Sequence, residues 1–146
     1  MIFYLNTSDL EPIQTQVEVK LTTKAKIIVV EDELDILDLI TYELEKNGYE
    51  VLVAKDGIQA LRIFEEEQPD LVITDIVMPK MNGFIFIQEI IKLAPGIPII
   101  AVSGAYGPKL DKMAPKLSLY SHFEKPFRVK DLLESAESAL NQKKPA

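Results

Sequence analysis

The segment PDLVITDIVMPKMNGF, residues 69–84, decides the fold prediction. Its first part is a short apolar run rich in β-branched residues, which predicts a buried strand over 70–74. The strand is followed by an acid, Asp75, and then by the turn formers Met78-Pro79 and Asn82-Gly83. A segment of helical period follows over 84–93. The order strand, acid, turn and helix is typical of one unit of a parallel α/β sheet.

Working outward, the same unit recurs along the chain. Further strands are predicted at 26–30, 50–54, 98–102 and 121–124, with helical faces at 36–44, 60–64 and 129–140 between or after them. Asn47-Gly48 is a plausible stop for the first helix. Five such units predict a doubly wound parallel sheet in the order 2-1-3-4-5, with helices on both faces.

The helix expected between the fourth and fifth strands has the weakest helical pattern in the sequence. Its region, residues 107–119, contains Pro108 and Pro115. Because an internal proline costs a helix about 3 kcal/mol, we expect this helix to be short or irregular.

Composition restricts the class of protein. The chain has 146 residues, 47% hydrophobic content and no cysteine, which fits one domain that folds without disulfides or a thiolate metal site. The net charge of −7 argues against a nucleic-acid surface. No signal peptide and no apolar run near the ~20 residues of a membrane helix is evident, so a cytoplasmic protein is expected. We divide the chain into an N-terminal extension of unknown role, 1–24, in which Val17, Val19 and Leu21 alternate as in a strand, and one domain, 25–146.

Polar residues follow the predicted strands, and these ends meet at one edge of a parallel sheet. They are Glu31, Asp32, Asp75, Ser103 and Lys125. Singly, each has an ordinary interpretation as a helix cap, a loop acid or a turn residue. Together, three carboxylates that face one another repel unless a cation binds between them, and their oxygen ligands suit Mg²⁺. A hydroxyl and an ammonium group opposite would stabilise a transferring phosphoryl group, with Asp75 as the natural nucleophile.

Four blocks carry a specific resemblance: IIVVEDE, PDLVITDIVMPKMNGF, IPIIAVSG and FEKPF. Their sequence and spacing resemble the receiver domain of bacterial two-component response regulators, from about Lys24 to the C-terminus. The resemblance implies a flavodoxin-like receiver fold and phosphorylation of Asp75. It also implies that Asp32, Asp75 and the backbone carbonyl of Val77 ligate Mg²⁺, with Glu31 contributing through water.

The resemblance assigns further roles at the switch. Lys125 contacts the phosphoryl oxygens, Ser103 hydrogen-bonds the phosphorylated aspartate, and His122 occupies the position of a rotating aromatic residue. Pro126, expected to follow a cis peptide bond, and Gly104 support the site. Ile76, Val77, Gly104 and Ala105 surround the path of attacking water. Some positions differ from the most frequent pattern: Glu31 stands for aspartate, Ser103 for threonine and His122 for tyrosine or phenylalanine. The run Leu119-Tyr120-Ser121 also lacks the typical small Gly-Ala pair.

The function expected from this resemblance is that of a switch and not of an enzyme. A histidine kinase or a phosphotransfer protein would phosphorylate Asp75, and the face made by the fourth helix, fifth strand and fifth helix would then control a protein target or a second copy of the chain. Only one helix follows Lys125, so we expect a stand-alone domain or a piece cut from a longer chain. Two alternatives remain: a degenerate docking module, and a magnesium phosphohydrolase, although such enzymes usually carry an acid where this chain has Val77.

Overall fold

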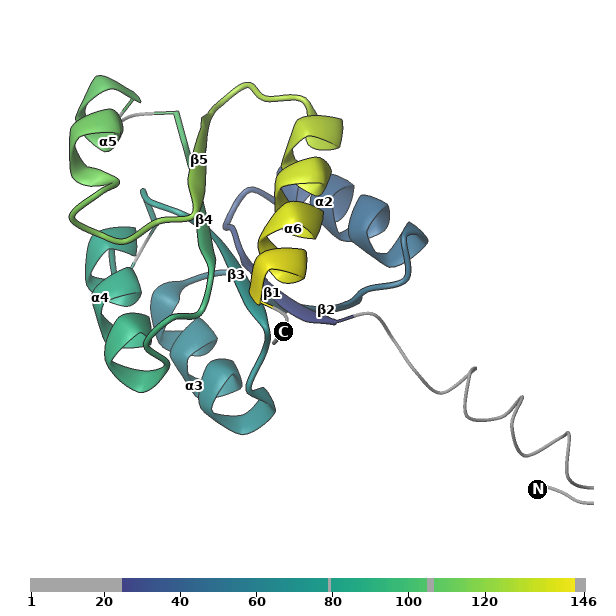
Figure 1. Ribbon diagram of the computed structural model, residues 1–146, viewed down its shortest axis with the longest axis horizontal. Helices are drawn as coiled ribbons and strands as arrows, with labels where there is room; N and C mark the ends of the chain where they lie inside the picture. The colour runs from purple at the N-terminus through teal and green to yellow at the C-terminus, as the bar shows by residue number, and fades with distance from the viewer. Residues whose placement is uncertain (1–24, 79, 105–106, 144–146) are drawn as a thin grey trace, which may run out of the picture.

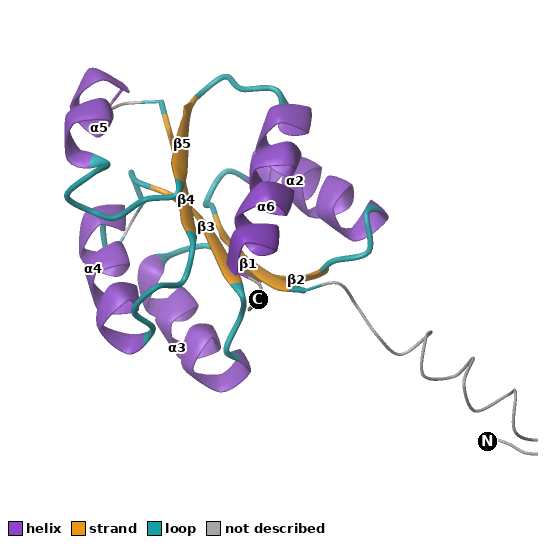
Figure 2. Ribbon diagram, viewed as in Figure 1, coloured by secondary structure: helices purple, strands orange, loops and turns teal. Residues whose placement is uncertain are grey.

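The computed structural model describes residues 25–78, 80–104 and 107–143, and they form a five-stranded parallel sheet with helices on both faces (Figures 1 and 2). The strand order is β2-β1-β3-β4-β5, and every neighbouring pair is parallel. The order and the fold class predicted from the sequence are confirmed. The extension 1–24, with its alternating Val17, Val19 and Leu21, lies outside the described residues.

The elements alternate along the chain. The strands are β1 (Lys26–Val30), β2 (Glu50–Ala54), β3 (Leu71–Asp75), β4 (Ile99–Ser103) and β5 (Ser121–Glu124). The helices, labelled as in Figure 1, are α2 (Leu34–Lys46), α3 (Gly57–Glu67), α4 (Gly83–Leu93), α5 (Gly107–Met113) and α6 (Val129–Lys143).

Alternation within each buried strand fills two separate cores. In β1, Ile28 and Val30 pack toward α3, α4 and α5, whereas Ile27 and Val29 pack toward α2 and α6. All four side chains are completely buried. Since successive side chains of a strand point to opposite faces, a strand covered on both faces must be apolar at every position. This requirement explains the continuous apolar runs in the sequence.

The helix ends follow local capping chemistry. The side chain of Asp56 accepts a hydrogen bond from the Gln59 backbone N–H at 2.8 Å and so caps α3. Asn82 caps α4 in the same way through the Ile85 N–H at 3.0 Å. The first helix stops at Asn47 as predicted, with Gly48 at φ 94°. The prediction for the fourth helix is confirmed too, because α5 has 7 residues.

Two strand boundaries differ from the prediction by one residue. The strands predicted at 70–74 and 98–102 begin and end one residue later, so that Asp75 and Ser103 are the last strand residues. Just before β3, the Asp70 carboxylate accepts a hydrogen bond from the Lys26 N–H at 2.9 Å, and the Asp70 N–H donates to the Lys26 carbonyl. At the other end of β3, Asp75 pairs with Val102 of β4. The two site residues are therefore held by the sheet and not by loops.

Among the described helices, none combines the length and the apolar character that a membrane crossing requires.

Candidate functional site

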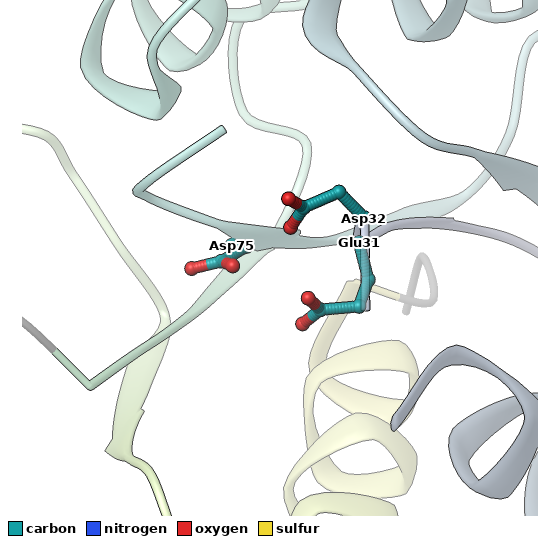
Figure 3. Close-up of side chains that lie close together, drawn as sticks. All are labelled: Glu31, Asp32 and Asp75. Atoms are coloured by element: carbon teal, nitrogen blue, oxygen red, sulfur yellow. The ribbon is translucent and has the colours of Figure 1, made fainter. Parts of the chain in front are cut away.

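Three carboxylates meet at the carboxyl end of the sheet. Glu31 and Asp32 directly follow β1, and Asp75 ends β3, which is paired with β1. Their side chains point into one space, and an oxygen from each lies within 4.8 Å of the others (Figure 3). The convergence predicted for these acids is confirmed.

Burial makes this cluster electrostatically costly. Glu31 is 1% exposed and Asp75 3% exposed, whereas Asp32 is exposed. Burial raises the pKa of Glu31 to about 7, and the Asp75 charge adds to the effect, against the opposing influence of the Glu33 N–H and of Lys125. One Glu31 oxygen, Oε1, is buried without a well-aligned hydrogen bond, and Lys125 Nζ lies 3.1 Å from it as an ion pair. A second cation between the acids would further offset the repulsion.

The ammonium group of Lys125 lies among the acids. Its Nζ donates hydrogen bonds to Glu31 Oε2 at 3.2 Å, Asp75 Oδ2 at 3.1 Å and Glu33 Oε1 at 2.8 Å. Burial alone would lower the pKa of Lys125, but the hydrogen bonds to Glu33, Asp75 and Glu31 hold it above its usual value. Lys125 is therefore charged at neutral pH.

The backbone around Lys125 fixes where this charge lies. Its N–H donates to the Ser103 carbonyl at 2.9 Å, which ties the lysine to the end of β4. The Lys125-Pro126 peptide bond is cis, as expected from the sequence. Gly104 lies beside the lysine, and a Cβ there would be in ordinary van der Waals contact with the Lys125 Cβ at 3.5 Å.

Asp75 is oriented by the chain that follows it. Its Oδ1 accepts the backbone N–H of Ile76 at 2.7 Å and of Val77 at 3.3 Å, and this leaves Oδ2 for Lys125. The turn is possible because residue 83 is glycine. A Cβ at Gly83 would lie 2.6 Å from the Asp75 carbonyl oxygen and from the Ile76 Cα. The Asn82-Gly83 pair thus packs the start of α4 directly against the acceptor strand.

The remaining predicted residues lie at different distances from the acids. Ser103 is completely buried at the end of β4, the strand next to Asp75. His122 lies on β5, and its Nε2 is 2.6 Å from Asp111 Oδ1 of α5. The side chain of Val77 is exposed at the rim of the site. Ala105 lies outside the described residues.

Sequence reasoning missed Glu33. This residue is the N-cap of α2, and its carboxylate makes the shortest contact to Lys125. The available signal was the third acid in the run Glu31-Asp32-Glu33. Because Glu33 and Lys125 are 92 residues apart, nothing in the local sequence pointed to the contact.

Comparison with known proteins assigns the family. Residues 27–137 match the family described as response regulator receiver domain, and the chain belongs to this family. Such domains are generally phosphoacceptor switches and not classical enzymes, and they typically bind Mg²⁺ in an acidic pocket. The resemblance noted from the sequence is therefore confirmed.

Relatives and solved structures agree with this assignment. The chain is 35% identical over 122 residues to the alkaline phosphatase synthesis transcriptional regulatory protein PhoP of Bacillus subtilis, covering 78% of this chain and 50% of that protein. It is 36% identical over 126 residues to the probable transcriptional regulator ycf27 of Guillardia theta, covering 86% and 49%. A receiver domain protein of Clostridium thermocellum has a TM-score of 0.76 at 37% identity, covering 82% of this chain and 96% of that one. The chain spans about half the length of these two curated relatives.

The acids present here fit the cation that the family binds. Mg²⁺ prefers oxygen ligands and binds through one or two carboxylates, retaining several waters. Glu31, Asp32 and Asp75 supply such oxygens in one place, and Glu31 Oε1 there makes an ion pair with Lys125 but no well-aligned hydrogen bond.

Proposed function

We propose that this chain is a phosphorylation switch in which Asp75 accepts a phosphoryl group from a histidine kinase or a phosphotransfer protein. The observation that carries the proposal is the setting of Asp75: a buried carboxylate oriented by two backbone N–H groups and contacted by a charged lysine at 3.1 Å. Structural acids seldom combine burial, fixed orientation and a neighbouring pair of further carboxylates.

In the transfer step, an oxygen of Asp75 forms a bond to phosphorus. The phosphorus–nitrogen bond of the phosphohistidine donor breaks, and its electron pair leaves with the imidazole. Lys125 lies where it can neutralise charge on the phosphoryl oxygens, and the Ile76 and Val77 N–H groups hold the attacking carboxylate in place. Positioning and charge stabilisation account for most catalysis of this reaction class.

Mg²⁺ belongs to this proposal. Asp32, Asp75 and the Val77 carbonyl would hold the ion, with Glu31 contributing through water. When bound, the ion supplies positive charge to the phosphoryl oxygens. This role explains why the chain keeps three repelling acids in one crevice.

The proposed output is a change in the face formed by α5, β5 and α6, which are the fourth helix, fifth strand and fifth helix of the sequence prediction. Ser103 would hydrogen-bond the phosphorylated Asp75, and His122 on β5 would respond. The PhoP and ycf27 relatives are named as transcriptional regulators. We propose that the face controls a cytoplasmic protein target or pairs with a second copy of the chain, without direct contact to nucleic acid.

Phosphorylation by a small donor tests the proposal without a kinase. Incubation with phosphoramidate and Mg²⁺ should add one phosphoryl group, seen by intact-mass analysis, and peptide mapping should place it on Asp75. Asp75→Asn and removal of Mg²⁺ with a chelator should each abolish the addition. Asp38→Asn, which alters an exposed acid of α2 in the same way, should be modified like the wild type. Full phosphorylation of Asp75→Asn would contradict the assignment.

A further inference from the structure

Lys125 has no spare hydrogen-bond donor. An ammonium group carries three N–H donors, and in this structure they go to Glu31, Asp75 and Glu33. A phosphoryl oxygen that arrives at Asp75 must therefore displace one of these acceptors before it can bind Lys125.

The three acceptors differ in what their release costs. The side chains of Glu31 and Asp75 are 1% and 5% exposed, whereas that of Glu33 is 59% exposed. A buried carboxylate that loses its partner stays without a hydrogen bond, but an exposed one is rehydrated at once. Asp75 itself becomes phosphorylated, so the comparison is between the two glutamates, and Glu33 is the one that can leave at the smaller cost.

A capping role does not account for Glu33. It is the N-cap residue of α2, yet its side chain makes no capping hydrogen bond. A capping side chain would accept a backbone N–H of the first helical turn. The Glu33 carboxylate instead lies 2.8 Å from Lys125 Nζ, and its own N–H donates to Glu31 Oε2 at 3.1 Å.

We propose that Glu33 is a positioning residue that occupies one ammonium donor of Lys125 in the resting protein and yields it to a phosphoryl oxygen when Asp75 is phosphorylated. The inference rests on the proposed function, since it concerns the same transfer to Asp75. Glu33 stabilises the resting state relative to the phosphorylated state, so it slows phosphorylation. The exchange returns the Glu33 carboxylate to water and leaves the buried acids in place.

Two variants distinguish the effect of the Glu33–Lys125 contact from the effect of the negative charge of Glu33. Glu33→Asp keeps the negative charge but shortens the side chain by one methylene and so loses the contact. Glu33→Gln removes the charge. Glu45→Gln, at an exposed position near the other end of α2, is the control for a general change in net charge.

The measurement is the rate of phosphorylation by phosphoramidate with Mg²⁺, together with the affinity for beryllofluoride, a phosphoryl analogue. Because exposed ion pairs are worth little, we expect both Glu33 variants to react about two- to fivefold faster than the wild type, with a matching gain in beryllofluoride affinity. The gain in Glu33→Asp should persist at high salt. Glu45→Gln should react at the wild-type rate. Urea unfolding should show that the faster phosphorylation of the Glu33 variants does not come with a loss of stability.

The outcomes are distinct. A gain in Glu33→Gln alone would show that only charge matters and would overturn the inference, as would an unchanged or slower Glu33→Asp. A wild type that gains no phosphoryl group would overturn the proposed function, and with it this inference.

Discussion

The acid crevice and the α5–β5–α6 face are built from different kinds of contact. In the crevice, the buried carboxylates of Glu31 and Asp75 both contact Lys125. The pKa of Glu31 depends on Asp75 and Lys125 as well as on burial. On the described part of the face, side-chain pairs at 2.6 Å join the chain at β5 to the helices beside it: His122 with Asp111 of α5, and Tyr120 with Ser138 and Ser121 with Ser135 of α6. Members of these pairs are exposed or half-buried, so water can replace each partner. The crevice is therefore held by buried contacts, whereas the pairs on the face cost little to break.

Removal of the Lys125 ammonium group should destabilise the acid crevice without altering the contacts of the α5–β5–α6 face. Lys125→Met leaves Glu31 and Asp75 buried without the cation between them, and the loss of one partner from such a cluster costs about 3–5 kcal/mol. We expect a decrease of this order in the free energy of unfolding, measured by urea denaturation in a chelator, with partial recovery on addition of Mg²⁺. Lys130→Met removes the same charge from an exposed position of α6 and should change stability by less than about 0.5 kcal/mol. Equal losses in the two variants would mean that the acids do not depend on Lys125.

Ser103 lies between the two regions, and its substitution should separate them. Ser103→Ala should still be phosphorylated on Asp75 but should lose a charge-assisted hydrogen bond of about 1.5–3 kcal/mol that we assign to the phosphorylated state. We expect phosphorylation to shift the amide signals around His122 and α5 in the wild type, and we expect these shifts to be muted in the variant. Ser103→Thr keeps the hydroxyl and should retain them. If Ser103→Ala showed the full shifts at His122, the hydroxyl would not couple the regions.

The two regions also differ in how far the sequence predicted them. The sheet and the convergence of Glu31, Asp32 and Asp75 were predictable, because apolar runs mark strands and the ends of parallel strands meet at one edge. The short α5 was predictable from its prolines. These features depend on local sequence and on one rule of topology.

What the sequence did not predict depends on side chains that meet across the fold. Glu33 could equally have capped α2, and only the folded chain brings it to Lys125. The pairing of His122 with Asp111 likewise needs the position of α5 relative to β5. The one-residue shift of β3 and β4 arises from hydrogen bonds between strands, which no single segment encodes.

The smallest effect is expected on the face itself, at the contact between α5 and β5. His122 Nε2 donates to Asp111 Oδ1 at 2.6 Å, with side chains 30% and 72% exposed, so the bond should contribute less than about 1 kcal/mol to global stability. The bond should make a larger fractional contribution to the free energy of local opening of α5, because that opening requires the bond to break. Asp111→Ala should therefore increase amide hydrogen exchange in α5 about two- to fivefold in the unphosphorylated protein, with the urea midpoint nearly unchanged. Asp131→Ala removes an acid of α6 that pairs with Arg128, the residue just before that helix, and should leave exchange in α5 unaltered. Equal exchange in Asp111→Ala and the wild type would show that the bond does not restrain α5. The position of α5 would then depend on the packing of the buried Leu110 and Leu117.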